Sequence, residues 1–365
     1  MYEIKEPSES FDDFLTLPAR LYTSRKLTQN KSDELALLSG THILSHCFTV
    51  IPITGYKDGV CCSRCMLTLY PDKDEAYLGF FECTDDSGMA AALLSYAKKK
   101  AAECGRTRLT GPVDASFWLR YRMKVNRFDD KRAYISEPYN LPYYRRLWEE
   151  NGFAVTEEYV SNLFGKIPLK NSGLEKFSKR LERFTAKGYS IVSPDKNSWD
   201  KCVDEVYSLI TVLYSDFPVF SDISREDFRA LYSGYKLILD FSFVKMAYFD
   251  GKPVGFFIGM PDYKNHLCKK PTLLTLLYVT LRKRFGKRYV LLYLGADKNH
   301  AGLGAAITQT LIERIARKNI TAIGAFIKRG KVTAGYAHGQ IKGEYEYLLF
   351  GTDLAAKDSK NDINT

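Results

Sequence analysis

The sequence lacks the features that would place a chain of 365 residues in a specialised class. It has no uninterrupted apolar run of about 18 residues, the length that a membrane-spanning helix needs. Its first residues, MYEIKEPSESFDDF, lack the basic and then apolar pattern of a secretory signal. With 45% hydrophobic and 26% charged residues, the composition also excludes a disordered or low-complexity chain. We therefore expect a folded cytoplasmic protein of about two domains, without membrane insertion.

The cysteines do not form a metal-binding pattern. There are eight of them, and without a secretory signal we expect reduced thiols. Cys62 and Cys65 have the spacing of half a zinc site, but no second pair has this spacing. Their segment also has the pattern of a strand, in which residues three positions apart point to opposite faces. We therefore predict no metal site.

The positive charge is confined to the second half of the chain. Residues 1–170 contain 23 basic and 23 acidic side chains, whereas residues 171–365 contain 30 basic and 20 acidic ones. The whole net charge of +10 therefore belongs to the second half. Such a charge favours an anionic partner: a phosphorylated cofactor, a nucleic acid or an anionic membrane. The alternative is a lysine-rich surface that contacts only solvent.

Two successive parts of the chain have the same predicted order of elements. In each, a hairpin with an Asp-Gly turn (residues 58–59 and 250–251) is followed by an apolar strand, a loop, a helix and further strands. We interpret this order as an internal duplication. It predicts an α/β fold (α+β, with mixed sheets) of two domains, residues 1–168 and 169–354, each a mixed central sheet flanked by helices. Residues 355–365 are predicted to form a disordered tail.

The segment with the most specific chemistry is residues 289–318, YVLLYLGADKNHAGLGAAITQTLIERIARK. An apolar strand is followed by a loop that contains Gly302 and Gly304 and leads into a helix. Small residues let a ligand approach the backbone closely, and the N–H groups at a helix N-terminus attract anions. No acidic side chain lies between residues 298 and 310. A diphosphate would therefore meet donors and no repulsion.

Two well-known glycine loops are excluded. The loop that binds nucleoside triphosphates ends in Gly-Lys-Ser/Thr, whereas Gly304 is followed by two alanines. The dinucleotide fingerprint needs three spaced glycines and an acidic residue about 20 positions further on, which Gly302 and Gly304 do not supply. A tight strand-to-helix turn without a ligand is the remaining alternative.

The loop resembles the acyl-CoA loop of the GNAT superfamily of N-acyltransferases, whose pattern is Arg/Gln-x-x-Gly-x-Gly/Ala. The matching residues are Asn299, Gly302 and Gly304, and Asn299 departs from the pattern. The hairpin at residues 250–255 and the helix that ends in a Gly-Phe pair at residue 152 are similar to the same family. The phrases GFFECTDD and GPVD are similar to a bacterial group of tandem-GNAT proteins of about this length. The resemblance covers nearly the whole chain and implies two GNAT-like domains in tandem.

The same resemblance implies acetyl-CoA or another acyl-CoA as co-substrate and a small-molecule amine as acceptor. The backbone of Leu292 and Leu294 would hydrogen-bond the pantetheine arm in the manner of an added strand. The family often uses a tyrosine four residues before a Gly-Phe pair as general acid. If Gly343 stands for that glycine, the matching position is Gly339, which has no side chain, so the acid would be Tyr336 or His338. The pyrophosphate would lie against the loop residues Asn299, His300, Ala301, Gly302, Leu303, Gly304 and Ala305.

The matching bend of the first half is acidic. Residues 82–88, ECTDDSG, place Glu82, Asp85 and Asp86 where a pyrophosphate would lie. Like charges at such distances repel by about 1 kcal/mol each, even with substantial screening. We therefore predict a degenerate cofactor loop in the first domain and CoA binding in the second domain alone.

Three functions stay open. The first is an acyl-CoA-dependent N-acyltransferase, in which a small amine attacks the thioester directly. The second is a GNAT-like protein that binds a metabolite or a partner without catalysis, which the departures at Asn299 and Gly339 favour. The third is a Fem-like transferase that uses aminoacyl-tRNA. Against it, the basic residues of this chain are scattered, and the loop suits a small phosphate ligand. We therefore do not expect a nucleic acid as partner. The cluster at residues 282–288 could contact nucleotide phosphates or form a solvated helix end.

Overall fold

A computed structural model describes residues 1–168, 174–268 and 272–354 of the chain. The chain forms two compact units. Unit 1 comprises Met1–Lys131, Pro138–Glu157 and the chain from Leu348 onward, and unit 2 comprises Arg132–Glu137 and Glu158–Tyr347. The tail predicted for residues 355–365 lies outside the described residues. In the described ranges, no helix is long and apolar enough to span a membrane.

Unit 1 is built on a mixed sheet. Its strands follow the order β1-β2-β3-β4-β5-β15, and all neighbouring pairs except β4 and β5 are antiparallel. Helix α3 connects the parallel pair, as the predicted strand–loop–helix–strand order requires. The strands are β1 (Tyr2–Lys5), β2 (Thr49–Lys57), β3 (Val60–Leu69), β4 (Glu75–Cys83), β5 (Arg108–Gly111) and, from Leu348, β15 (Ile341–Asp353).

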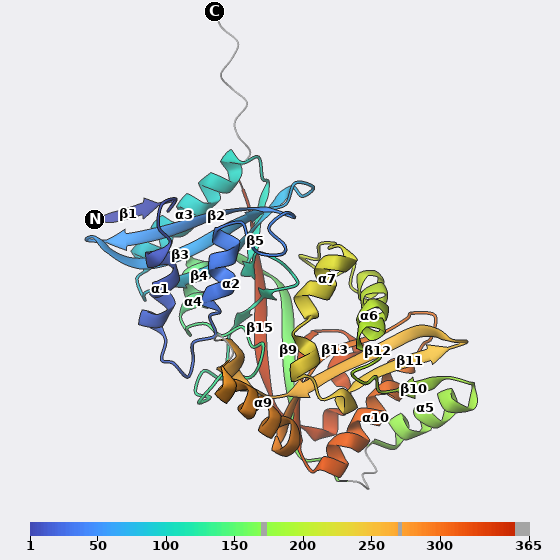
Figure 1. The fold of residues 1–365 in the computed structure, drawn as a ribbon. Helices are drawn as coiled ribbons and strands as arrows, with labels where there is room; N and C mark the ends of the chain where they lie inside the picture. Colours follow the sequence, from blue (N-terminus) through green and yellow to red (C-terminus); the bar gives the residue numbers. More distant parts are fainter. Residues whose placement is uncertain (169–173, 269–271, 355–365) are drawn as a thin grey trace, which may run out of the picture. The chain divides into compact units, whose positions relative to one another are not determined.

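Helices cover both faces of this sheet (Figure 1). On one face, α3 and α4 pack their apolar residues, among them Leu93, Leu94 and Trp148, against the strands. On the other face, Arg64 of β3 forms a buried ion pair with Glu34 of α2 at 2.7 Å. The remaining elements are α1 (Asp12–Leu21), α2 (Lys31–Leu38), α3 (Ser87–Glu103), α4 (Tyr144–Glu150), β6 (Val113–Asp114), β7 (Arg120–Tyr121) and β8 (Met123–Lys124).

The cysteine pair of β3 departs from the predicted alternation. The register of β2 and β3 shifts at Cys62, because Gly55 pairs with Ser63 while Tyr56 pairs with Cys61. This β-bulge inserts one residue, so Cys62 and Cys65 join the same apolar core instead of pointing to opposite faces. Burial raises the pKa of both thiols, which favours the neutral form and not the thiolate that binds metals.

The strands of unit 2 follow the order β9-β14-β13-β12-β11-β10. Only β13 and β14 are parallel, and helix α10 connects them. The helices α5 and α10 pack on one face, where Phe177, Phe184 and Leu311 lie in the core. The strands are β9 (Ala154–Phe164), β10 (Ser190–Val192), β11 (Val244–Phe249), β12 (Lys252–Pro261), β13 (Arg288–Ala296) and β14 (Thr321–Lys328).

The helices of unit 2 include one that the sequence did not predict. Helix α9 lies between β12 and β13 in the chain, where an apolar segment ends in a basic turn. Residues 331–342, which contain too many glycines for a helix, form two short 3₁₀ turns instead. The helices are α5 (Glu175–Ala186), α6 (Trp199–Leu213), α7 (Arg225–Tyr232), α8 (Tyr235–Ile238), α9 (Leu273–Phe285) and α10 (Leu303–Lys318), with 3₁₀ turns η2 (Phe241–Phe243), η3 (Lys264–Cys268), η4 (Val332–Gly335) and η5 (His338–Gln340).

No single position along the chain divides the two units. Strand β9 begins in unit 1, and its part from Glu158 pairs with β14 in unit 2. Strand β15 begins in unit 2, and its part from Leu348 pairs with β5 in unit 1. The last strand of each half therefore completes the sheet of the other half.

Candidate functional site

The parallel strands of unit 2 separate after a short paired stretch. Pairing of β13 with β14 runs from Arg288 to Leu291, and none is found beyond it in the described chain. On the other side, β13 stays paired with β12, but the register shifts at Leu292: Ile258 pairs with Tyr293 while Gly259 pairs with Leu291. The bulge bends the strand and leaves one edge of residues 292–296 open. Such an edge can bind an extended ligand as an added strand.

The loop that follows β13 is held by its own backbone. The Asp297 side chain accepts the N–H of Asn299 at 2.9 Å, and its carbonyl accepts that of His300. Gly302 has φ of +92°, which an L side chain rarely adopts, and precedes α10. The N–H groups of Leu303 and Ala305 bond back to His300 and Gly302.

Three N–H groups at this bend remain available. Those of Ala301, Gly302 and Gly304 have no hydrogen-bond partner among the described residues. No side chain caps the N-terminus of α10 either. Unpaired amides at a helix start form an anion site, because the helix dipole adds positive potential there.

A guanidinium group lies against Gly302 of this bend. A methyl group added to Gly302 would collide with the guanidinium of Arg180, a residue of α5. Arg180 is exposed and forms no ion pair or hydrogen bond within the described part of the chain. Helix α5 is held against α10 by Phe177 and Phe184 in the shared core, so its position follows from packing. The bend therefore presents three amides and one unpaired cation.

Tyr336 lies beside the same bend. A methyl group added to Gly304 would be 3.5 Å from the Tyr336 hydroxyl and 3.8 Å from the side chain of Leu294. The ring of Tyr336 packs edge-on against Phe177 at 5.4 Å. Burial raises the pKa of Tyr336, while the nearby Arg180 charge opposes the rise. The hydroxyl thus stays protonated at the mouth of the separated strands.

The other predicted residues lie differently. His300 accepts or donates a 2.6 Å hydrogen bond with the hydroxyl of Tyr189 and packs edge-on against that ring, so its side chain has a packing role. Asn299 is exposed. Leu303 is buried in the core. His338 is exposed in η5 and forms no hydrogen bond to a described side chain.

Leu294 already has one partner. Its carbonyl oxygen accepts a hydrogen bond of 3.2 Å from the hydroxyl of Tyr214, which follows helix α6. Tyr214 also stacks on Phe217 at 4.6 Å. An extended ligand on the open edge of β13 would replace the Tyr214 hydroxyl with its own amide N–H as the donor to the Leu294 carbonyl oxygen. Neither Tyr214 nor Arg180 was predicted, because both lie on helices about 80 and 120 residues away in sequence, among many similar side chains.

The matching bend of unit 1 is filled by side chains. Asp86 caps α3 by accepting the N–H of Met89 at 3.0 Å, and it also binds Lys57 and the hydroxyl of Tyr2. The hydrogen bond from Lys57 holds the pKa of Asp86 down at about 2. A methyl group added to Gly88 would lie 2.7 Å from the Tyr2 hydroxyl. Carboxylates and a phenol thus take the place that amides and a cation take in unit 2.

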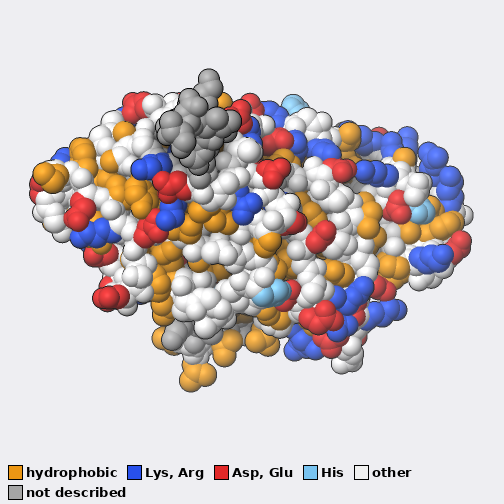
Figure 2. Space-filling model, turned by 90° about the horizontal axis from the view of Figure 1, so that it is seen from above, with side chains coloured by type: hydrophobic (Ala, Val, Ile, Leu, Met, Phe, Trp, Pro, Cys, Tyr) orange, Lys and Arg blue, Asp and Glu red, His pale blue; other side chains and the backbone are white. Residues whose placement is uncertain are grey.

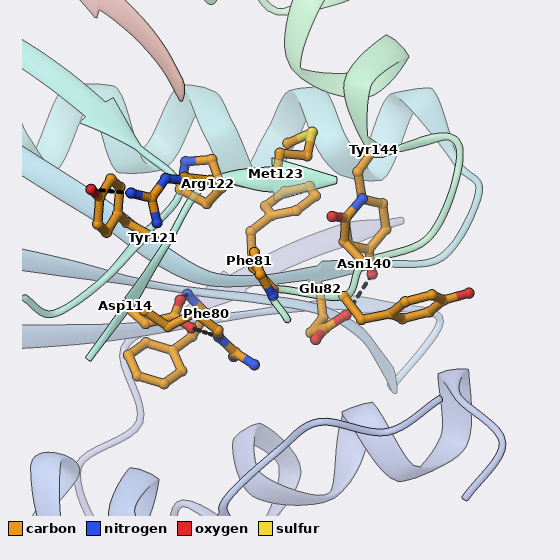
Figure 3. A pocket seen from close by; sticks show the side chains of 13 residues that line it. Phe80, Phe81, Glu82, Asp114, Tyr121, Arg122, Met123, Asn140 and Tyr144 are labelled. Carbon is orange, nitrogen blue, oxygen red and sulfur yellow. Dashed lines mark hydrogen bonds and ion pairs between the residues drawn. The ribbon is translucent and has the colours of Figure 1, made fainter. Parts of the chain in front are cut away.

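Unit 1 contains a pocket where β4 and β5 separate (Figure 3). Pairing of these strands ends at Tyr77, and the pocket opens beside the following residues of β4. Its cavity volume is about 40 Å³. Acidic, basic and aromatic side chains face it. The lining residues are Phe80, Phe81, Glu82, Pro112, Asp114, Arg120, Tyr121, Arg122, Met123, Pro138, Tyr139, Asn140 and Tyr144.

Glu82 is the most perturbed group of this pocket. Its Oε2 atom accepts hydrogen bonds from Tyr22 at 2.7 Å and from Tyr144 at 2.6 Å, the second drawn in Figure 3. Burial raises the pKa of Glu82 to about 7, against the opposing effects of Arg64, the two tyrosines and Arg120. The sequence placed Glu82 among the three carboxylates of the bend. In the structure, Glu82 is the second-last residue of β4 and its side chain lines the pocket.

Comparisons with known proteins identify this architecture. No protein-family model and no curated protein matches the sequence. A tandem GNAT protein from the clavulanic acid biosynthesis pathway is similar over 98% of this chain and 100% of its own, with a TM-score of 0.53 at 12% identity. A GCN5-related glucosamine N-acetyltransferase region of a fungal multi-domain GH3 β-N-acetylglucosaminidase is similar over 96% of this chain, with a TM-score of 0.55 at 12% identity. This chain spans only 38% of that protein.

A third similar structure is a probable N-acyltransferase from Enterococcus faecalis, with a TM-score of 0.50 at 10% identity over 98% of this chain and 74% of its own. Identities this low show the fold and nothing finer. The chain therefore has the GNAT acyltransferase fold, twice in tandem.

Proposed function

We propose that the chain is an acyl-CoA-dependent N-acyltransferase that acts in the cytoplasm on a small amine, with the acyl-CoA bound in unit 2. One observation carries the proposal: three unpaired amides and the Arg180 guanidinium meet at the N-terminus of α10, beside the open edge of β13. The amides of Ala301, Gly302 and Gly304 and this cation fit a diphosphate. The open edge fits the amide-bearing pantetheine arm.

The residues of unit 2 can support direct transfer. When bound, acyl-CoA supplies the activated thioester carbonyl. The strand edge and the bend would orient the thioester at the opening between β13 and β14. An attacking amine must be neutral, and the departing thiolate needs a proton. Tyr336 can give that proton, because burial keeps its hydroxyl protonated and it lies next to Gly304. His338 stays a second candidate on the neighbouring turn.

The alternative function is a protein that binds the cofactor but does not catalyse acyl transfer. The hydroxyl of Tyr214 bonds to the carbonyl of Leu294, the position that the pantetheine arm would use. A protein that binds a nucleotide by its diphosphate alone would retain this bond. The position that the family fills with a tyrosine is Gly339 here, which has no side chain. Binding without turnover is therefore the alternative that the following experiments separate.

The first prediction concerns the three amides at the N-terminus of α10. Gly304→Glu adds a carboxylate beside the three amides, and we expect it to weaken binding of CoA about tenfold or more by like-charge repulsion. The fold should tolerate the change, because the added atoms meet only ordinary contacts and an acidic residue suits a helix N-terminus. Isothermal titration calorimetry with CoA measures the effect. Gly234→Glu, at a position with open space, is the matched control and should bind CoA as the wild type does.

The second prediction concerns the cation. Arg180→Ala removes the guanidinium over Gly302, and we expect CoA affinity to fall about five- to tenfold and to depend less on salt concentration. Lys179→Ala removes the neighbouring exposed charge of the same helix and should leave the affinity unchanged. Equal losses in both variants would show a diffuse field and not a contact, which would contradict the assigned role of Arg180.

The third prediction separates catalysis from binding. Tyr336→Phe keeps the ring against Phe177 and removes only the hydroxyl, so kcat should fall about 10²-fold while the KM for acetyl-CoA changes little. Thiol release from acetyl-CoA with a panel of small primary amines measures this. Tyr248→Phe, whose hydroxyl bonds Glu205 elsewhere in unit 2, is the control. CoA binding by the wild type without thiol release for any amine would favour the binding protein instead.

A further inference from the structure

The pocket of unit 1 holds opposite charges that do not neutralise each other. Glu82 uses one carboxylate oxygen for the two tyrosine hydroxyls, and its other oxygen has no hydrogen bond to a described residue. Arg120 uses its Nε for Asp114 at 2.5 Å and one Nη for Thr28. No ion pair joins Glu82 and Arg120 in the described chain, although each affects the other's pKa. One acceptor and one guanidinium nitrogen therefore remain for a ligand.

The rest of the pocket is apolar and aromatic. Phe80, Phe81 and Met123 supply hydrophobic surface. The ring of Tyr139 already faces the ammonium groups of Lys26 and Lys124. Figure 3 shows Glu82 and Tyr144 on one side and Asp114 on the other. Because the bend that would hold a diphosphate is filled by Asp86 and Tyr2, the opening of these strands is not a nucleotide site. Its cavity of about 40 Å³, which opens to solvent, suits only a ligand of a few non-hydrogen atoms.

We propose that the pocket of unit 1 binds a free α-amino acid, with its ammonium group on Glu82, its carboxylate on Arg120 and its side chain against Phe80, Phe81 and Met123. A zwitterion satisfies both free groups at once, whereas a simple amine or a simple carboxylate leaves one of them desolvated and unpaired. The proposal does not rest on the acyl transfer assigned to unit 2, because every contact belongs to unit 1.

The test is calorimetry on the full chain without CoA. Glycine, L-alanine, L-leucine and L-phenylalanine are titrated beside N-acetyl-L-leucine and L-leucine methyl ester, which lack the ammonium and the carboxylate respectively. We expect the better-fitting free amino acids to bind, and both blocked derivatives to bind at least tenfold more weakly. Absence of binding by all four amino acids, or equal binding of the blocked forms, would overturn the proposal.

The matched variants are two substitutions in the same strand. Glu82→Gln should weaken amino-acid binding at least tenfold. Glu75→Gln should not, although Glu75 also accepts two hydroxyl groups, from Tyr77 and Thr110. Unchanged binding by Glu82→Gln, with thermal melting showing both variants folded, would exclude Glu82 as the ligand group.

The pH dependence gives an independent readout. Glu82 is faced by Arg64 of β3, Arg120 of β7, and the hydroxyls of Tyr22 and Tyr144. Because its pKa is about 7, affinity should rise from pH 6 to pH 8 as the carboxylate ionises, while the ligand's ammonium stays protonated. Glu82→Gln should lose this rise. A pH-independent affinity of the wild type would contradict the ammonium–carboxylate contact.

A second inference comes from helix α9 of unit 2. Leu273, Leu277, Leu281 and Phe285 follow one another at intervals of four, which places them on one face of the helix. This face is exposed: Leu273 is 85% exposed, and Phe285 is 61% exposed. Leu274 and Leu276 widen it. Hydrophobic side chains protrude at the lower edge of the face shown in Figure 2. An apolar patch of this kind on a soluble surface marks an interaction site.

The basic residues around the exposed apolar face of α9 indicate which kind of partner it fits. Residues 272–296 contain five Lys and Arg and no acidic side chain. Arg284 and Lys287 are exposed at the end of α9. Two copies of such a helix face would bring like charges together, which opposes self-association. Leucines and a phenylalanine bordered by Lys and Arg suit the boundary between the headgroups and acyl chains of anionic lipid.

We infer that α9 docks unit 2 on an anionic membrane surface without crossing it. The prediction is tested by flotation of the full chain with vesicles of phosphatidylcholine containing 30% phosphatidylglycerol and with vesicles of phosphatidylcholine alone. We expect binding to the anionic vesicles only, reduced at least fivefold by 0.5 M NaCl. The double variant Leu273→Ser, Leu277→Ser should bind at least fivefold less.

Val332→Ser is the control, since Val332 is 80% exposed elsewhere in unit 2 and should not affect flotation. Absence of flotation with anionic vesicles would overturn the inference. So would wild-type flotation by the double leucine variant. A dimer in analytical ultracentrifugation that the leucine variant dissociates, without vesicle binding, would instead assign the face to a second copy of the chain.

Discussion

The candidate site of unit 2 depends on the separation of two parallel strands. Strands β13 and β14 share four residue pairs and then part, while β13 stays fixed to β12 through a bulge at Leu292. The separation frees one backbone edge, and helix α10 begins at the same end. A strand edge and a helix N-terminus are the two places where a backbone has donors without partners. Bringing them together lets one extended, anionic ligand satisfy both.

The two units show how one fold accommodates opposite electrostatics. In unit 1 the separated strands β4 and β5 are retained, but Asp86 caps α3 and pairs with Lys57. A carboxylate at a helix N-terminus stabilises the helix and excludes a second anion. The space left between the strands contains Glu82 and Arg120 in place of donors for a diphosphate. The duplicated frame therefore fixes where a ligand can lie, and local side chains decide its charge.

The sequence predicted the parts that depend on local pattern. The hairpins with Asp-Gly turns, the apolar strand before Gly302 and the helix after it follow from periodicity and turn residues. Arg180 was not predictable, because its position over Gly302 comes from the packing of α5 on α10. The bulge at Cys62 was missed for a similar reason: it is set by the partner strand. The exposed face of α9 was not predicted, and only the fold shows that most of it is uncovered among the described residues.

Comparing the N-termini of α3 and α10 shows how the unpaired amides of unit 2 affect stability. Helix α3 has a side-chain cap, and such caps typically stabilise a protein by about 1 kcal/mol. Helix α10 begins at Gly302, which has no side chain to offer, and its first amides stay without partners in the described structure. An Asp or Ser at this position would strain a backbone with φ of +92° and would collide with Arg180. Helix α10 therefore lacks the stabilisation that Asp86 gives α3, and an anion bound at its first amides would supply it.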